Sequence, residues 1–275
     1  MNSKLEKTIS DEEVLEESID RTDIPNDIKL ESLINAAVSG GANLQKRRRN
    51  VRKLFDYLSS EIPAYFGLKK PRVYLRFGRY QDFKRRVGWK KIAATAFYNG
   101  KKTIYLNERT LKPPYRGVTY SKAMAVNPGR ALALALAHEL GHALDYNYNQ
   151  QQFDGTIFAY INDVKTPYLY ARSLQESTAE AVATAYLKSA LCDFSYTSLS
   201  ERSFNDNGTA FIYGCSICAG KLVSSIDERS RVKIIREVIL SRNPDKKLER
   251  LFSGEFNKVS ARMVKVSNGY LNTKK

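Results

Sequence analysis

Cysteine, histidine and long apolar runs are scarce in this 275-residue chain, and each scarcity limits what the protein can be. Three cysteines, Cys192, Cys215 and Cys218, are an odd number for a disulfide framework, so we expect free thiols and a cytoplasmic or other reducing intracellular location. No stretch approaches the roughly 18 uninterrupted apolar residues of a membrane span, and no apolar segment follows a basic start at the N-terminus. The sequence therefore predicts neither membrane contact nor a signal peptide.

Charge is abundant and unevenly distributed. Lys and Arg number 45 against 29 Asp and Glu, yet residues 1–31 hold 4 basic and 10 acidic residues. This first segment also lacks aromatic side chains, and it can bury too little apolar surface to offset the entropy lost on ordering. We predict that residues 1–31 form a disordered acidic leader. The other 244 residues hold 41 basic and 19 acidic residues, a balance that favours an anionic partner.

The basic residues are concentrated in the N-terminal half. Between Lys46 and Lys102 the chain has 18 Lys and Arg against three acidic residues, interleaved with aromatic side chains. Cations contact phosphates and aromatic rings stack on bases, so this stretch predicts binding of nucleic acid or another polyanion. The alternative is a solvated basic face whose aromatic rings turn into the core. The residues predicted to contact the polyanion are Lys46, Arg47, Arg48, Arg49, Arg52, Lys53, Arg85 and Arg86.

A basic helix and a small sheet are expected next. Residues 45–53 (QKRRRNVRK) lead into an apolar pattern that predicts an amphipathic helix ending near Pro63, within a basic helical extension over residues 32–63. Three short segments rich in β-branched and aromatic residues come after it, at residues 73–77, 92–98 and 103–107. Asn99 and Gly100 separate the last two, which predicts a hairpin with a type I′ turn because both residues tolerate positive φ.

The second half of the chain predicts helices. Asn127 is suited to cap a helix that begins at Pro128, and residues 131–137 are apolar on every face, as in a helix at the centre of a domain. We expect this helix over residues 130–145. The later segments are a polar loop with Asp154-Gly155 and Pro167, an alanine-rich helix at residues 174–191, an irregular stretch with Gly208, Gly214 and Gly220, and helices at residues 226–241 and 246–263. The predicted class is a mainly helical α+β fold with a small sheet.

The most specific pattern is His138-Glu139-Leu140-Gly141-His142, on the buried helix. Both histidines of the chain lie in it. Histidines four residues apart share one helix face, so their imidazole nitrogens can converge on one tetrahedral metal ion. Glu139 can then reach a water on that ion as a general base. We predict one zinc ion per chain, bound by His138 and His142.

A catalytic zinc needs a third protein ligand, and the chain has no third histidine. The next predicted helix offers two carboxylates four residues apart, Glu176 and Glu180. One can bind the metal while the other hydrogen-bonds a ligating imidazole. The assignment stays open because Ser173-x-x-Glu176 also matches a capping box, in which Glu176 would return to the backbone and Glu180 would be the ligand.

HELGH followed by Glu-x-x-x-Glu resembles the gluzincin-type zinc metallopeptidases. HELGHALD is similar to the catalytic helix of anthrax lethal factor and of phage-repressor-cleaving metallopeptidases, and AEAVATAYL resembles the segment that comes after that helix in both. The resemblance covers about residues 128–190 and the upstream hairpin. It implies a zincin-like metallopeptidase domain over residues 64–200, with an active-site helix, followed by a helical C-terminal cap over residues 201–275.

The same resemblance implies a function and a site. The expected activity is hydrolysis of a protein or peptide that lies extended along the edge strand of the sheet. The implied roles are metal ligands for His138, His142 and Glu176, the general base for Glu139, and support of an imidazole for Glu180. A Tyr, Arg or backbone donor would stabilise the oxyanion, and Tyr168, Tyr170 and Arg172 lie just ahead of the glutamate helix. Tyr170 is our candidate, and an aromatic ring packed in the core is the alternative.

Two further alternatives remain. Asp145 lies one turn past His142 and can orient a ligand, although an exposed polar residue near a helix end fits its position equally well. The alternative function is a polyanion-binding structural or virion-associated protein that keeps a zincin-like fold with little or no hydrolysis. The intact Glu139 favours the enzyme, because a structural zinc does not need that acid.

Overall fold

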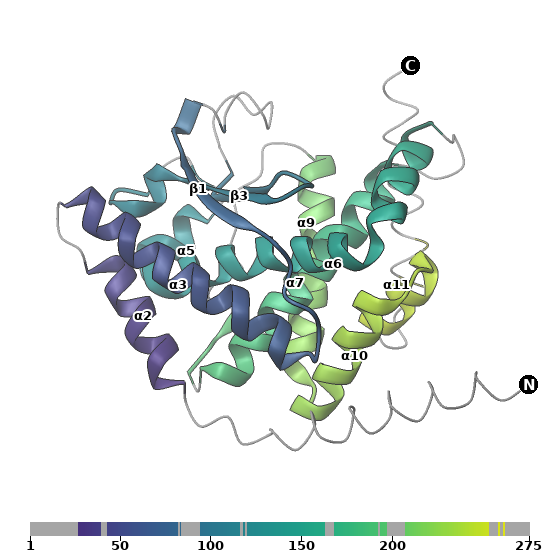
Figure 1. The fold of residues 1–275 in the computed structure, drawn as a ribbon. Helices are drawn as coiled ribbons and strands as arrows, with labels where there is room; N and C mark the ends of the chain where they lie inside the picture. Colours follow the sequence, from purple (N-terminus) through teal and green to yellow (C-terminus); the bar gives the residue numbers. More distant parts are fainter. Residues whose placement is uncertain are drawn as a thin grey trace, which may run out of the picture.

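Helices dominate the computed structural model, and a small three-stranded sheet lies beside them (Figure 1). The structure describes residues 27–39, 43–81, 83, 94–115, 118, 120–162, 168–191, 193–196, 207–252, 258 and 261. The strands are β1 (Tyr74–Gly78), β2 (Ala96–Tyr98) and β3 (Thr103–Asn107). The helices are α2 (Ile28–Val38), α3 (Leu44–Tyr65), η1 (Glu108–Leu111), α5 (Ser121–Val126), α6 (Pro128–Asn162), α7 (Tyr168–Ala190), α9 (Asn207–Ser225), α10 (Glu228–Leu240) and α11 (Pro244–Phe252). The predicted mainly helical α+β class is confirmed.

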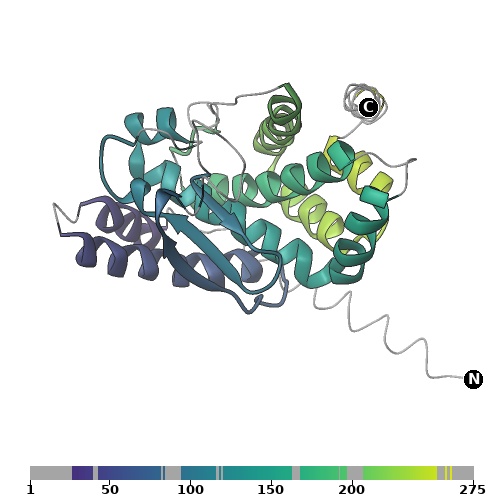
Figure 2. The same cartoon turned by 90° about the horizontal axis from the view of Figure 1, so that it is seen from above.

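The elements fall on two sides of the molecule. In Figure 1, α2, α3 and α5 lie on one side with the strands, and α10 and α11 lie on the other, with α6 extending between them. The view from above shows the same separation of the strands from α10 and α11 (Figure 2). Within the described part of the chain, no helix combines the length and hydropathy that a membrane crossing requires.

The sheet has the order β1-β3-β2, with β1 parallel and β2 antiparallel to β3. Strand β2 is therefore an edge strand, and it packs against α6. The predicted hairpin is confirmed, but its turn is longer than a two-residue type I′ turn. The N–H of Asn99 donates to the carbonyl of Thr103, and the Asn99 side chain accepts from the N–H groups of Lys101, Lys102 and Thr103. Gly100 supplies the positive φ of 70°.

Each of the two N-terminal helices begins at a side-chain cap that was not predicted. The carboxylate of Asp27 accepts from the N–H of Leu30 and caps α2, so the helix begins inside the segment predicted as a leader; residues 1–26 lie outside the described part. Asn43 caps α3 in the same way, and α3 ends at Tyr65, two residues past Pro63. The amphipathic helix predicted here is confirmed.

Helix α6 begins as predicted and ends much later. The side chain of Asn127 accepts from the N–H of Arg130, and Pro128 is the first helical residue. The helix then continues to Asn162, with non-helical φ and ψ at Asn149, so the loop predicted around Asp154-Gly155 is wrong. Glycine inside a helix is only about 1 kcal/mol less favourable than alanine. Gly155 alone is therefore not enough to end the helix.

The C-terminal part differs most from the prediction. The stretch expected to be irregular forms α9, whose buried Ala219 and Val223 lie four residues apart on one face. Its packing against α7 outweighs the helix-breaking tendency of its glycines. Helices α10 (Glu228–Leu240) and α11 (Pro244–Phe252) occupy the two segments predicted as helical. Within the rest of the second segment only residues 258 and 261 are described, and both are helical.

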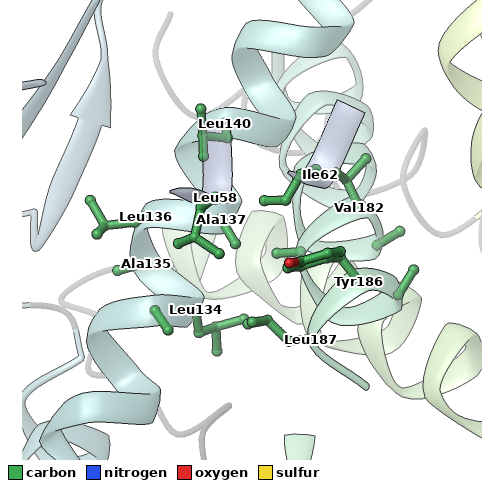
Figure 3. Close-up of a cluster of buried hydrophobic side chains, with 14 of the residues drawn as sticks. Leu58, Ile62, Leu134, Ala135, Leu136, Ala137, Leu140, Val182, Tyr186 and Leu187 are labelled. Atoms are coloured by element: carbon green, nitrogen blue, oxygen red, sulfur yellow. The ribbon is translucent and has the colours of Figure 1, made fainter. Parts of the chain in front are cut away.

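The core gathers around the apolar first half of α6. Residues 131–137 are all buried, as their composition predicts. Figure 3 shows the side chains of Leu134 and Leu140 near those of α3 and α7, among them Leu58, Ile62, Val182, Tyr186 and Leu187. Burying each leucine contributes about 1.5–3 kcal/mol, so this packing fixes how α6 and α7 lie against each other.

Candidate metal centre

The predicted site residues meet where α6 crosses α7. His138, Glu139 and His142 lie on α6, and Glu176 and Glu180 lie on α7. The two backbones approach closely because α6 has a glycine at the crossing. A Cβ added to Gly141 would lie 2.8 Å from both the Cα and the carbonyl oxygen of Ala179. Since Gly141 precedes His142 and Ala179 precedes Glu180, the closest approach coincides with the site.

His138, His142 and Glu176 bring their donor atoms together. The Nε2 atom of His138 is 2.9 Å from one carboxylate oxygen of Glu176, and the Nε2 atom of His142 is 3.5 Å from the other. One donor atom from each residue lies within 4.8 Å of the others, and all three residues are buried. Two imidazoles and a carboxylate are the ligands of one class of catalytic zinc site, so this group could hold a metal ion.

Glu180 occupies a different position. One of its carboxylate oxygens is 2.7 Å from Nδ1 of His138, the ring nitrogen that faces away from Glu176. The capping-box alternative is wrong, because α7 begins at Tyr168 and Ser173 lies inside the helix. In the structure Glu176 completes the cluster and Glu180 holds the far side of an imidazole.

Glu139 faces the edge of the sheet. The backbone N–H of Tyr98 in β2 donates to its carboxylate over 2.6 Å. Burial raises the pKa of Glu139, while the neighbouring His142 and His138 and the Tyr98 N–H oppose that rise. A carboxyl whose pKa is raised holds a transferred proton more readily, which suits a group that accepts and returns a proton.

His138 and Glu176 each shift the pKa of the other. Burial alone would lower the pKa of His138, but hydrogen bonds to Glu176 and Glu180 and the charges of both raise it to about 10. Burial alone would raise the pKa of Glu176. The guanidinium of Arg172, 2.6 Å away, and both histidines outweigh that effect and hold the pKa well below its usual range. Without a metal ion, the two carboxylates therefore keep a proton on His138.

Two contacts of the glutamates were not predicted. The ion pair of Arg172 with Glu176 joins residues four apart on α7, a spacing that is visible in the sequence. The hydrogen bond from Tyr196 to Glu180 joins residues 16 apart and has no such signal. Tyr170 lies in the first turn of α7, but its side chain is not among those described, so its role stays a prediction.

Asp145 is not the exposed residue that its position near a predicted helix end suggested. It is buried, and one carboxylate oxygen accepts from Nζ of Lys247 over 2.5 Å and from Asn149 over 2.8 Å. Helix α6 continues past Asp145, and α11 supplies the lysine. The residue ties α11 to α6, and no described contact joins it to His142.

The basic residues predicted to bind a polyanion divide into two groups. The guanidinium of Arg47 donates to the carbonyl of Leu111, and that of Arg48 pairs with Glu108, so both hold η1 against α3. The exposed ones on α3 are Lys46, Arg49, Arg52 and Lys53; Arg85 and Arg86 lie outside the described residues. The interleaved aromatic rings are also divided, since Phe83 is buried and Tyr74 is 63% exposed.

Cys215 and Cys218 lie on α9 and are not joined in a disulfide bond, as expected, and Cys192 lies outside the described residues.

Comparison of the chain with known protein families, with characterised proteins and with solved structures found no match.

Proposed function

We propose that the chain is a zinc-dependent metallopeptidase. The observation that carries the proposal is the buried group of His138, His142 and Glu176, with Glu139 directly beside it. A structural zinc site is closed by four protein ligands, whereas among the described residues this group supplies three, with the carboxylate of Glu139 beside them. That arrangement fits hydrolysis better than structural support.

The chemistry divides between the metal and the chain. A zinc ion held by His138, His142 and Glu176 would supply a Lewis acid and lower the pKa of a bound water. Glu139 would accept the proton of the attacking water and deliver it to the leaving amine, since its raised pKa suits both transfers. Arg172 lies beside the cluster with 41% of its side chain exposed, and with Tyr170 it is a candidate donor to the developing oxyanion.

The sheet edge supports a peptide as the substrate. Tyr98 lies on β2, and its N–H points away from β3 toward Glu139. An extended peptide can add to such an edge through main-chain hydrogen bonds, whatever its sequence. A peptide bound along β2 would place its backbone beside Glu139, which favours an endopeptidase.

Hydrolysis of a mixed peptide library by zinc-loaded protein tests the proposal. We expect cleavage by the wild type and a loss of about 100-fold or more in Glu139→Gln, which removes the base and keeps the shape. Glu249→Gln makes the same change at an exposed position of α11 and should cleave like the wild type. No cleavage by the zinc-loaded wild type, or equal cleavage by Glu139→Gln, would contradict the proposal.

The second candidate is polyanion binding. It is favoured by the exposed cations Lys46, Arg49, Arg52 and Lys53 along one helix. It predicts DNA or RNA binding that weakens steeply with salt, is reduced by changing these four residues to Glu, and is unchanged in Glu139→Gln. Salt-independent binding, or no binding at low salt, would exclude it.

A further inference from the structure

Tyr196 lies behind the candidate metal centre, on the side away from Glu176. Its hydroxyl donates to one carboxylate oxygen of Glu180 over 2.7 Å, and the other oxygen of Glu180 is 2.7 Å from Nδ1 of His138. The opposite ring nitrogen of His138 faces Glu176. Tyr196, Glu180 and His138 are each at most 4% exposed, so the chain of contacts is closed to solvent.

Such a chain controls the direction in which an imidazole points. A glutamate side chain has three rotatable bonds, and a hydrogen bond at one oxygen alone leaves it free to swing. A donor fixed at the second oxygen holds the carboxylate, and the carboxylate in turn fixes the plane and tautomer of the imidazole. In a buried setting both hydrogen bonds are stronger than they would be in water.

The position of Tyr196 depends on α9. A Cβ added to Gly220 of α9 would lie 2.4 Å from Cζ, 2.6 Å from the hydroxyl oxygen and 2.7 Å from Cε1 of Tyr196. Carbon atoms at such distances overlap, so the space for the hydroxyl end of the ring exists only because residue 220 has no side chain. Gly214, on the same helix, has open space around its Cα and imposes no such requirement.

We propose that Tyr196 is a positioning residue of the metal centre, acting through Glu180 on His138, and that Gly220 reserves its place. Helix α9 is then part of the metal site instead of a separate cap. The inference rests on the proposed zinc site and extends it to residues that touch neither the metal nor the substrate.

The first test compares two tyrosine variants by zinc affinity, measured by competition with a chelator. Tyr196→Phe removes the hydroxyl that holds Glu180, and we expect zinc to bind about 5- to 10-fold more weakly, somewhat less than the 10- to 100-fold typical of losing a direct partner of a ligating histidine. Tyr65→Phe removes a hydroxyl that is bonded to Ser189 and Glu228, outside the metal centre. It should bind zinc like the wild type.

The second test changes only residues of α9, so it can be carried out even if the Tyr196→Phe variant does not fold. Gly220→Ala pushes the Tyr196 ring away and should weaken zinc binding by a similar factor, although residue 220 is not in the site. Gly214→Ala adds the same methyl group to the same helix where space is open and should keep the wild-type affinity.

The outcomes separate the inference from the proposed function. A wild type that binds no zinc overturns the function. A wild type that binds zinc, with Tyr196→Phe or Gly220→Ala binding it equally well, overturns the role of Tyr196 alone. Equal weakening in Tyr65→Phe or Gly214→Ala also overturns it, because the effect would then reflect a general loss of packing.

Discussion

Replacing Gly141 by Ala tests whether the close approach of α6 and α7 builds the site. Taken as an isolated helix, α6 should gain about 1 kcal/mol from the change, since alanine is the better helix former. The added Cβ would instead lie 2.8 Å from the backbone of Ala179, against 3.4 Å or more in an ordinary contact. Backbone atoms cannot turn aside as a side chain can, so the helices must separate by about 0.6 Å or bend.

Overpacking of this kind costs about 1–3 kcal/mol, and against a rigid backbone we expect the upper part of that range. After the gain in helix propensity, the net loss of unfolding free energy should be about 1–2 kcal/mol, a fall in Tm of roughly 2–4 °C for a chain of this size. Zinc affinity should fall as well, because the separation moves Glu176 away from His138 and His142. The assay is thermal unfolding together with chelator competition, with Gly214→Ala as the control.

A Gly141→Ala variant that is as stable as the wild type and binds zinc equally well would refute this reasoning. Loss of stability with unchanged zinc affinity would refute the claim that the crossing of α6 and α7 sets the distances between the metal ligands, because the crossing would then support the fold alone.

Three further predictions rest on buried contacts. Lys247→Met leaves the carboxylate of Asp145 buried without its cation and should cost about 3 kcal/mol of unfolding free energy in chemical denaturation, whereas Lys246→Met at the exposed neighbour should cost little; similar midpoints would contradict this. Glu180→Gln should weaken zinc binding about 10- to 100-fold by chelator competition, and an unchanged affinity would exclude its role on His138. The raised pKa of His138, about 10 against 6.5, stabilises the metal-free fold fully below pH 6.5, and this contribution is lost as the pH rises through 10. Zinc binds neutral imidazole, so uptake at pH 7 should release a proton and affinity should rise up to about pH 10; calorimetry in buffers of different ionisation enthalpy would show no such release if this is wrong.

The parts of the protein that local sequence determines were predicted well. Helix α6 has three such features: the cap at Asn127, the wholly apolar run and the histidine pair at helical spacing. Each depends on residues only a few positions apart, so each is visible in the sequence. The pair of glutamates was visible in the same way. Which of them joins the two histidines depended on the residue at which α7 begins. Helix α7 begins five residues before Ser173, which removes the capping box.

The parts that depend on packing between distant segments were not predicted. Glycines normally predict an irregular chain. In α9, however, Gly220 faces Tyr196, 24 residues earlier in the chain, whose ring occupies the space that a side chain at residue 220 would need. Asp145 looked exposed because its partner, Lys247, lies 102 residues away. Such pairs become visible only when the helices are placed against each other, and the hydrogen bond of Tyr196 to Glu180 beside the metal centre is another of them.

Zinc content per chain tests the central claim most directly. Elemental mass spectrometry of protein purified without a metal column should find about one zinc in the wild type and in Glu249→Gln, and little in His142→Ala and Glu176→Ala. A wild type that stays folded and takes up no zinc when it is offered would contradict the account, and so would zinc retained in Glu176→Ala.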